Sequence, residues 1–591
     1  MYRTHHCGEL RKEQAGKKVK IAGWVDSRRD HGGLVFIDLR DREGVTQVVF
    51  DPSSSPQAAE LSHELRSEFV VQVEGEVTLR PEGTANPSLP TGAIEVRAAN
   101  ITVLNPAAPL PYPLDDTNVN EDLRLEYRYL DVRRRAMQSN LRQRHRIVKA
   151  IRDYLDQKGF WEIETPILSK STPEGARDYL VPSRVHPGSF YALPQAPQQY
   201  KQLLMVGGIE KYFQIARCFR DEDLRADRQP EFTQVDLEIS FPSQEEIFAL
   251  IEGMMRLIWK DVLCVTLPAE FPKLTYNEVM NRFGSDKPDT RYAMELIDLT
   301  EVFRNSTFKV FAGAVQAGGV VKAINAKKFA DVTTGQIEQL TELAKTFGAK
   351  GLAWIKVEGG EWKSPIVKFF SDAEKQSMTR MLGVEEGDLM LFAAGERAAS
   401  CEILGRIRTH LAELLSGLGK LSIDPKAWNF LWVKDFPLFM KDPETGRLAA
   451  MHHPFTRPNA EDEEKMESDP MSARAQAYDV VLNGMELGGG SIRIHEAALQ
   501  KRMFKALQIP DDTAQEQFGH LLRAFSFGAP PHGGLAIGLD RLAMLICNAS
   551  SIREVIAFPK NARAQDLMSH SPGPVEPKQL RELSIDIIKK K

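Results

Sequence analysis

Charged side chains within Phe213–Ser240 could bind a polar ligand, because they stand in runs that alternate polar and apolar residues. The runs Gln214–Glu222 and Glu231–Ile239 have a period of two, which predicts two antiparallel strands, each with one buried face. Arg220 lies in the first run and Asp236 in the second. A charged group on a core strand is costly unless it is paired, and a ligand is one candidate partner. An edge hairpin with a solvated polar face is the alternative.

A second stretch with chemical potential is Tyr478–Ile494, which reads YDVVLNGMELGGGSIRI. Its glycines, Gly488–Gly490, interrupt a strand pattern, which indicates close approach of a ligand or another chain to the backbone. A glycine-rich hairpin is the alternative. Asp479 and Glu486 carry hard carboxylates that suit Mg²⁺ together with substrate phosphates. Two acids at this spacing could also be ordinary surface residues.

Two arginines later in the chain offer anion sites. Arg493 supplies a planar guanidinium fork that fits a carboxylate. Arg541 stands in the first turn of a helix that we expect to start at Asp540, after a glycine-rich turn ending at Gly538. A helix N-terminus with an arginine favours anions, although one glycine-rich turn is weak evidence taken alone.

The composition bounds the protein class. With 591 residues the chain is too long for one core, so we expect three or four domains. A net charge of −5 and 42% hydrophobic residues are ordinary for a soluble protein and give no global sign of nucleic-acid binding. The five cysteines are scattered, which suits reduced thiols and gives no zinc site. Without a signal peptide or a long apolar run, we expect a cytoplasmic protein that does not enter membranes.

The first 104 residues have the pattern of an OB-fold barrel. They contain five predicted strands with a helix between the third and fourth; these strands are Val19–Trp24, Leu34–Arg40, Val45–Phe50, Phe69–Leu79 and Ile94–Ala98. Alternation along the second strand puts Val35, Ile37 and Leu39 in the core, so Phe36 points outward. An outward phenylalanine suits stacking on nucleotide bases, and a surface phenylalanine without function is the alternative.

A proline-rich linker separates this barrel from the rest. Asn105–Leu114 carries four prolines and marks a boundary. A helical run to about Gln157 follows, and Trp161–Ile167 is predicted to be a strand that Pro166 confines to a sheet edge or end. Between 287 and 417 we expect a compact α+β domain; its predicted strands are Lys309–Ala312, Leu352–Val357 and Met390–Ala394, and its helices Thr334–Phe347 and Cys401–Leu415.

Three motifs in order resemble those of class II aminoacyl-tRNA synthetases. Phe219–Glu222, followed by a charged loop and Arg228–Phe232, resembles motif 2, in a variant close to that of bacterial aspartyl enzymes. Gly159–Pro166 resembles motif 1, a helix and strand of the homodimer interface, and Gly538–Leu542 resembles motif 3. The resemblance covers essentially the whole chain. It implies an OB-fold barrel in 1–104, a hinge in 105–130, a catalytic α+β domain with an antiparallel sheet in 131–286 and 418–560, an α+β insertion in 287–417 and an extension in 561–591.

The resemblance also implies roles for individual residues. Aspartate would be bound by a set of polar side chains: Glu174, Gln198, Lys201, Arg220, Asp236, His452, His453 and Arg493. ATP would be bound by residues of motifs 2 and 3 and one acid: Arg220, Asp221, Glu222, Gln229, Glu486, Gly538, Leu539, Asp540 and Arg541. Arg220 and Arg541 would act catalytically, and Asp479 and Glu486 would hold Mg²⁺. Related enzymes usually have serine where Ala196 stands, which puts one polar contact in doubt.

Two adjacent histidines follow the predicted strand Leu448–Met451, and strand geometry predicts where their side chains lie. Neighbouring side chains on a strand point to opposite sides, so His452 and His453 could not both bind one metal there. We expect one of them in the core and one in a pocket.

The implied reaction joins L-aspartate to tRNA through aspartyl-adenylate, and the barrel residues Arg29, Phe36 and Gln47 would contact the anticodon. His31 and Gly83 resemble the non-discriminating form, which charges both tRNA(Asp) and tRNA(Asn) and needs an amidotransferase partner. Taken alone, both are simply loop residues, and a strictly tRNA(Asp)-specific enzyme is the alternative.

Three other hypotheses stay open from the sequence. One is a synthetase paralogue that forms amides and does not act on tRNA, which the intact N-terminal barrel disfavours. Another is a non-catalytic RNA-binding regulator, which the intact arginines and Glu486 disfavour. A lysyl or asparaginyl enzyme is a nearer rival with the same plan, but the stretches GARDYLVPSR and GGGSIRIH and the long insertion favour aspartate.

Overall fold

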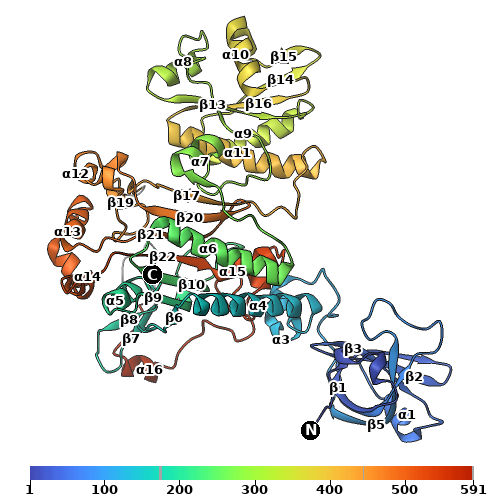
Figure 1. Ribbon diagram of the computed structural model, residues 1–591. Coiled ribbons are helices and arrows are strands. Elements are labelled where there is room, and N and C mark those ends of the chain that lie inside the picture. The colour runs from blue at the N-terminus through green and yellow to red at the C-terminus, as the bar shows by residue number, and fades with distance from the viewer. Residues whose placement is uncertain (172–175, 443–444, 589–591) are drawn as a thin grey trace. The chain divides into compact units, whose positions relative to one another are not determined.

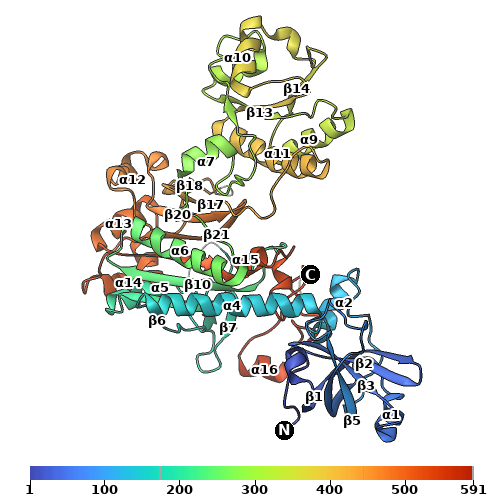
Figure 2. The same ribbon diagram turned by 45° about the vertical axis from the view of Figure 1, so that its right-hand side comes forward.

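The computed structural model describes residues 1–171, 176–442 and 445–588, and its chain divides into two compact units (Figures 1 and 2). The first unit is Met1–Arg124 with Tyr129–Gln138, and the second is Leu125–Arg128 with Ser139–Lys591.

The first unit contains a closed five-stranded barrel with strand order β1-β2-β3-β5-β4. One helix, α1 (Pro56–Ser62), lies between the third and fourth strands in the chain. The strands are β1 (Lys18–His31), β2 (Leu34–Asp41), β3 (Gly44–Phe50), β4 (Val70–Leu79) and β5 (Ile94–Asn105). The predicted OB-fold is therefore confirmed.

Strand β2 shows how the sequence sets the faces of this barrel. Val35, Ile37 and Leu39 are at most 1% exposed and belong to the barrel core. Phe36, between them, is only half-buried and points to the other face. The period of two predicted this arrangement correctly.

The second unit is built on an eight-stranded sheet of order β11-β17-β20-β21-β22-β10-β9-β6. Its strands are antiparallel except at the two edges, where β11 pairs with β17 and β6 with β9 in parallel. The strands are β6 (Trp161–Glu162), β9 (Lys211–Phe219), β10 (Glu231–Ser240), β11 (Lys273–Thr275), β17 (Phe430–Lys434), β20 (Ala477–Leu482), β21 (Met485–Ile492) and β22 (His532–Gly538).

Strand β10 lies inside this sheet, between β9 and β22, so the edge-hairpin alternative is excluded. On one side of β10, Val235 and Leu237 are fully buried in the main apolar core. Helices α4 (Arg135–Gln157), α6 (Gln244–Ile258) and α15 (Leu539–Ile546) contribute to the same core, and α4 and α6 run side by side (Figures 1 and 2). The opposite side of β10 carries Asp236 and Glu238, both with no exposed surface.

Glycine is needed at three positions of β21 because neighbouring groups leave no room for a Cβ atom. A Cβ at Gly488 would stand 2.3 Å from the carbonyl oxygen of Ala536, and one at Gly490 2.0 Å from that of Gly534. A Cβ at Gly489 would stand 2.3 Å from a carboxylate oxygen of Asp479. The close approach predicted from the sequence is therefore made by β22 and by a side chain of β20.

A separate five-stranded sheet of order β12-β13-β16-β14-β15 forms the α+β block within the insertion. Its strands are β12 (Ile297–Asp298), β13 (Val320–Ala326), β14 (Ala353–Glu358), β15 (Glu361–Lys363) and β16 (Leu389–Gly395). Its helices are α8 (Lys309–Gln316), α9 (Thr334–Thr346), α10 (Asp372–Leu382) and α11 (Arg397–Gly417).

One predicted strand is wrong, and another is shorter than predicted. Lys309–Ala312 is the start of helix α8, and its buried Phe311, Ala312 and Val315 follow helical spacing. A short apolar run does not distinguish the two structures. Trp161–Ile167 is a strand only at β6, the predicted sheet edge, after which the chain leaves the sheet toward Pro166.

Two short helices, α2 (Glu121–Glu126) and α3 (Arg128–Asp131), are divided between the two units. The other elements of the second unit are α5 (Gln198–Val206), α7 (Tyr276–Phe283), α12 (Lys465–Ser468), α13 (Ala497–Ala506), α14 (Asp511–Phe525), α16 (Pro577–Glu582) and the strand pairs β7 (Leu180–Pro182) with β8 (Phe190–Ala192) and β18 (Phe439–Lys441) with β19 (Leu448–Ala450). A search of the described helices finds none with the length and apolar character needed to cross a membrane.

Candidate active site

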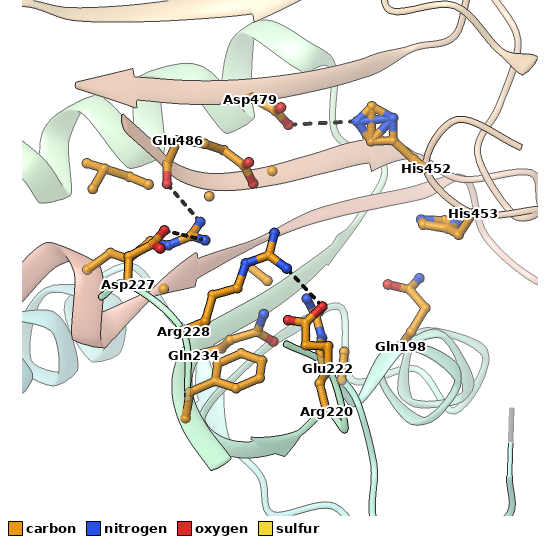
Figure 3. A pocket seen from close by; sticks show the side chains of 18 of the residues that line it. Gln198, Arg220, Glu222, Asp227, Arg228, Gln234, His452, His453, Asp479 and Glu486 are labelled. Carbon is orange, nitrogen blue, oxygen red and sulfur yellow. Dashed lines mark hydrogen bonds and ion pairs between the residues drawn. The ribbon is translucent and has the colours of Figure 1, made fainter. Parts of the chain in front are cut away.

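A cavity of about 450 Å³ opens on the side of the main sheet away from α4 and α6, and Figure 3 shows its walls. Its lining contains most of the polar residues predicted from the sequence; these are Gln198, Arg220, Glu222, Gln229, His452, His453, Asp479, Glu486, Gly538, Asp540 and Arg541. Their positions along the chain differ by more than 300 residues, and the sheet brings them together.

A buried cluster of four charges adjoins this cavity. Lys201, on α5, donates from Nζ to Asp236 Oδ1 at 2.6 Å and lies 3.2 Å from Glu238 Oε2. Lys201 is 2% exposed and both acids are fully buried. Among the described residues, Asp236 Oδ2 has no hydrogen-bond partner. Burial raises the pKa of Asp236, while the neighbouring Lys201 ammonium lowers it in part.

Arg493 completes the cluster from the end of β21. Its Nε and Nη2 donate to Glu238 Oε1 and Oε2 at 3.0 and 3.2 Å, a bidentate pair across 255 residues of chain. Its Nη1 donates to Ser491 Oγ at 2.7 Å and contacts His453 Nε2 at 2.6 Å. Burial raises the pKa of the Glu238 carboxyl, but Arg493 and Lys201 outweigh it, so that pKa is lowered overall.

Both ring nitrogens of His453 face hydrogen-bond donors. Arg493 Nη1 lies at Nε2, and the Phe455 backbone N–H lies 3.2 Å from Nδ1. A protonated ring carries an N–H at both nitrogens. One N–H would therefore face the Phe455 N–H and the other the Arg493 guanidinium. Burial, and then the charge of Arg493, hold the pKa of His453 well below its usual range.

His452 lies on the same cavity wall and also titrates low. Its Nε2 is 3.8 Å from Asp479 Oδ1, and its ring meets Phe436 edge to face. Removal from water, and then Arg493, lower the pKa of His452 to about 4. Both histidines therefore line the cavity, and the expectation of one in the core was wrong. Strand β19 ends at Ala450, so strand alternation does not apply at these positions.

Three arginines stand on the part of the wall that carries motifs 2 and 3. Arg228 donates to Glu222 at 3.1 Å (Figure 3), and Arg541 Nη2 lies 3.2 Å from Asp227 Oδ2. Arg220 stacks over the Phe232 ring at 5.1 Å, and its Nε has no hydrogen-bond partner among the described residues. This wall offers guanidinium groups to an anion.

Two carboxylates that suit a cation stand on the opposite wall, on β20 and β21. Asp479 and Glu486 line the cavity together with Asp286. Burial, and then the charges of Glu486 and Asp286, raise the pKa of Asp479 well above its usual value. A divalent cation would relieve this repulsion, and hard oxygen donors are what Mg²⁺ prefers. No group of three or more possible metal ligands is found in the described part of the chain.

Several predicted residues do not line the cavity. Lys201, Asp236 and Arg493 lie in the adjoining charge cluster, and Leu539 is in the apolar core. Asp221 also lies outside the cavity lining, with its Oδ2 3.8 Å from Arg177 Nε. Glu174 falls outside the described residues.

Asp540 lines the cavity, but its carboxylate is held from two sides. It accepts the Thr233 N–H at 2.8 Å and an Arg144 donor at 2.5 Å. Sequence reasoning did not assign roles to Glu238, Asp227 or Asp286. Glu238 could have been predicted, because it shares a strand face with Asp236. No sequence pattern indicated Asp227 or Asp286.

A second pocket, of about 510 Å³, lies on the barrel. Arg29, His31, Phe36 and Gln47 all line it, together with Pro81 and Thr84, which flank Gly83. Arg29 donates to Asp38 at 3.0 Å, and Gln47 donates to Glu95 at 3.1 Å. Gly83 has a φ of +80°, and a Cβ there would meet nothing within 4 Å.

Comparisons with known proteins agree with this layout. The family model "tRNA synthetases class II (D, K and N)" matches residues 120–562, and the model "OB-fold nucleic acid binding domain" matches 19–104. Class II synthetases use ATP. The chain is 57% identical to the aspartate–tRNA(Asp/Asn) ligase of Opitutus terrae, with 100% of both chains covered. It is 54% identical to the aspartate–tRNA ligase of Geobacillus kaustophilus, covering 100% of this chain and 99% of that protein.

Solved structures show the same fold. An asparaginyl-tRNA synthetase from Pyrococcus horikoshii, complexed with asparaginyl-adenylate, matches with a TM-score of 0.59 at 18% identity, over 95% of this chain and 98% of that one. An aspartyl-tRNA synthetase from Entamoeba histolytica matches with a TM-score of 0.57 at 19% identity, over 94% and 91%. From its motifs, its barrel and sheet, and its full-length relatives, the chain belongs to the class II aminoacyl-tRNA synthetases of the aspartate, lysine and asparagine group.

Proposed function

We propose that the protein attaches L-aspartate to tRNA in two steps, with ATP as the energy source. In the first step an oxygen of the aspartate α-carboxylate attacks the α-phosphorus of ATP, and the bond to pyrophosphate breaks. In the second step the terminal ribose hydroxyl of tRNA takes the aspartyl group and AMP leaves. The relatives with 54–57% identity over the full length are named for this reaction.

The observation that carries the proposal is the buried cluster beside the cavity. Aspartate brings two carboxylates and one ammonium, and the cluster offers Lys201 and Arg493 as cations and the unpartnered Asp236 Oδ2 as an acceptor. We assign the substrate side-chain carboxylate to the two cations and the substrate ammonium to Asp236. Gln198, His452, His453 and Glu174 are proposed to complete the aspartate site.

ATP is assigned to the arginine-bearing wall. Arg220 is proposed to stabilise the charge that develops at the α-phosphoryl group, because it lines the cavity and its Nε has no hydrogen-bond partner in the described part of the chain. Arg541 is proposed to bind the terminal phosphate by exchanging Asp227 for it. Asp221, Glu222, Gln229, Gly538, Leu539 and Asp540 are proposed to shape the nucleotide site around them. No side chain needs to become covalently attached, because positioning and charge stabilisation suffice.

Mg²⁺ is proposed to bind at Asp479 and Glu486, whose oxygen donors and mutual repulsion fit a divalent cation. When bound, the ion would neutralise phosphate charge. Asp479 and Glu486 would hold the ion through their carboxylate oxygens.

The barrel pocket is proposed to bind the anticodon through Arg29, Phe36 and Gln47. Its open position at Gly83 and the nearby His31 support charging of both tRNA(Asp) and tRNA(Asn), as the name of the Opitutus terrae relative implies for that protein. An amidotransferase would then convert the misacylated product. A strictly tRNA(Asp)-specific enzyme is the second candidate, since the Geobacillus kaustophilus relative is named only as an aspartate–tRNA ligase.

Three further assignments follow from family membership. The protein is proposed to form a homodimer through α4 and the segment ending at Pro166, where Trp161 is 63% exposed. It is proposed to act in the cytoplasm. Functionally, the chain is proposed to divide into the barrel 1–104, the hinge 105–130, the catalytic domain 131–286 and 418–560, the insertion 287–417 and the extension 561–591.

The test is ATP–pyrophosphate exchange with purified protein and each of aspartate, asparagine, glutamate and lysine. Exchange that depends on aspartate alone is the expected result. Exchange driven equally by asparagine or lysine would assign the site to another member of the same group.

A further inference from the structure

Arg144, on helix α4, is joined to the candidate active site through one carboxylate. Its Nη1 donates to Asp540 Oδ1 at 2.5 Å, and the side chains of Arg144 and Asp540 are 18% and 4% exposed. Asp540 stands in the first turn of α15, directly before Arg541, which is proposed to bind the terminal phosphate of ATP. No role was assigned to Arg144 above.

The other carboxylate oxygen of Asp540 reaches the strand that follows the motif 2 loop. Oδ2 accepts the backbone N–H of Thr233, on β10, at 2.8 Å. The pairing of β10 with β22 ends at Gln234 and Gly538, so the carboxylate serves as the hydrogen-bond partner for the next residue of β10. A buried N–H needs such a partner.

This contact joins the segments that carry two arginines of the cavity wall. Thr233 follows Phe232, and the guanidinium carbon of Arg220 lies 5.1 Å from the centre of the Phe232 ring. The carboxylate of Asp540 therefore ties the backbone beside the ring that supports Arg220 to the helix turn that carries Arg541.

A carboxylate removed from water is stable as an anion only when its charge is paired, and Arg144 supplies the paired cation. We propose that Arg144 is a positioning residue for adenylate formation, which through Asp540 fixes the spacing between Arg220 and Arg541. Reaction within a bound complex depends on such spacing, because a displacement of about 1 Å can cost roughly a hundredfold in rate. The effect on catalysis rests on the proposed function, whereas the contact itself does not.

A second contact of Arg144 leads to the loop of motif 2. Its Nη1 also donates to the Val555 carbonyl oxygen at 3.3 Å. Earlier in the same segment, the Ser551 hydroxyl and the Ile552 N–H both donate to the Ala226 carbonyl oxygen, at 3.0 and 3.1 Å. Ala226 lies in the loop between β9 and β10, and residues of that loop line the cavity. Both contacts of Arg144 therefore lead to segments that carry proposed ATP ligands.

The test is a double-mutant cycle on Arg144 and Asp540, with KM for ATP, KM for aspartate and kcat measured by pyrophosphate exchange. Arg144→Met removes the guanidinium and leaves a flexible apolar chain. Asp540→Asn removes the charge that Arg144 compensates and keeps an oxygen that can accept the Thr233 N–H. Arg146→Met is the matched control, because Arg146 is exposed on the same helix, with Nη2 3.4 Å from the Asp261 carbonyl oxygen.

Arg144→Met should raise KM for ATP and lower kcat, with a combined loss of roughly ten- to a hundredfold in kcat/KM for ATP. KM for aspartate should stay within about twofold, because Lys201 and Arg493 form their ion pairs with Asp236 and Glu238. In the Asp540→Asn background, Arg144→Met should change KM for ATP by less than about twofold, because substitutions of two residues in contact are not additive.

A kcat that falls while both KM values stay unchanged would mean that Arg144 only keeps the protein folded, and would overturn the positioning role. Kinetics of Arg144→Met that match those of Arg146→Met would overturn it as well. Effects that multiply in the double variant would show that Arg144 does not act through Asp540. If Arg144→Met alone does not fold, Asp540→Asn and the double variant still decide, since a further rise in KM for ATP between them contradicts the proposal.

Absence of aspartate-dependent exchange in the wild type would contradict the proposed function instead. Calorimetric titration of the same proteins with ATP measures the coupling without turnover. Weaker ATP binding in Arg144→Met than in the wild type, with no further loss in the Asp540→Asn background, supports the positioning role, and equal binding contradicts it.

Discussion

Lys201 and Asp236 form a fully buried ion pair in which only one carboxylate oxygen of Asp236 is used. Lys201 Nζ donates to Oδ1 at 2.6 Å, while Oδ2 has no hydrogen-bond partner among the described residues. The same ammonium lies 3.2 Å from Glu238, which in turn binds Arg493. The four charges balance, and we propose that this carboxylate oxygen accepts the ammonium of the substrate.

Replacing Asp236 by asparagine should therefore impair both aspartate binding and stability. Breaking a buried ion pair by removing one partner costs about 3–5 kcal/mol, and the substrate ammonium loses its acceptor. We expect KM for aspartate to rise at least about a hundredfold, as 2.7 kcal/mol or more implies. Exchange kinetics and chemical denaturation measure the two effects. Asp153→Asn is the control, because it removes only an exposed pair with Lys149. Unchanged aspartate affinity in Asp236→Asn would contradict the assignment.

Arg220→Ala should nearly abolish adenylate formation while the protein stays folded. Loss of one preorganised contact to developing charge costs about 3–4 kcal/mol, or roughly a hundred- to a thousandfold in rate. Arg217→Ala serves as the control, since Arg217 stands on β9 just before Arg220 in the chain and its side chain is exposed, with Nε 4.0 Å from Glu231 Oε2. Substantial pyrophosphate exchange in Arg220→Ala would exclude the proposed role.

Arg493→Leu should remove the preference for aspartate over uncharged amino acids. The bidentate contact with Glu238 needs a planar fork, so Arg493→Lys should also lose most of the activity. Exchange rates with aspartate, asparagine and leucine measure the selectivity. A variant Arg493→Leu that still prefers aspartate to leucine would argue against a role in side-chain recognition.

The free energy of unfolding should depend on pH in part through His453. In the folded protein its pKa is well below the usual 6.5, so below that pH the unfolded chain binds a proton that the folded protein does not. The free energy of unfolding should therefore fall as the pH drops below 6.5, by about 1.4 kcal/mol per pH unit for one such group. His453→Gln should reduce this slope in denaturation experiments by the share of one group, while His452, whose pKa is also lowered, keeps its own contribution. An NMR titration of His453 with a midpoint near 6.5 would contradict the structure.

A larger side chain at position 83, in place of Gly83, should lower the charging of tRNA(Asn) more than that of tRNA(Asp). Gly83→Asn adds a side chain where a Cβ meets nothing, and asparagine tolerates the positive φ better than other residues do. We expect charging of tRNA(Asn) to fall about tenfold, the effect of 1.4 kcal/mol, and charging of tRNA(Asp) to change little. Gly16→Asn is the matched control, since Gly16 also has a positive φ and open space. Equal loss for both tRNAs would mean that Gly83 does not discriminate.

The sequence predicted the supporting elements better than the contacts between them. Alternation fixed which residues of β2 and β10 face the core, because a strand has only two faces. It failed at Lys309–Ala312, where three consecutive apolar residues fit a helix or a strand equally well, and at the two histidines, which lie beyond the end of β19.

The pairing of Arg493 with Glu238 had no local signal. The two residues lie 255 positions apart, and only the order of strands in the sheet brings β21 close to β10. The sequence also could not predict that Asp236 Oδ2 has no hydrogen-bond partner among the described residues, because hydrogen-bond satisfaction depends on tertiary neighbours.

Aspartate charging of purified tRNA(Asp) and tRNA(Asn) transcripts tests the central claim most directly. The proposed function predicts that both transcripts receive aspartate, with comparable efficiency, in a reaction that needs ATP and Mg²⁺. Charging of tRNA(Asp) alone would leave the catalytic assignment intact and contradict the relaxed recognition assigned to His31 and Gly83. Failure to charge either transcript with aspartate would contradict the proposed function itself.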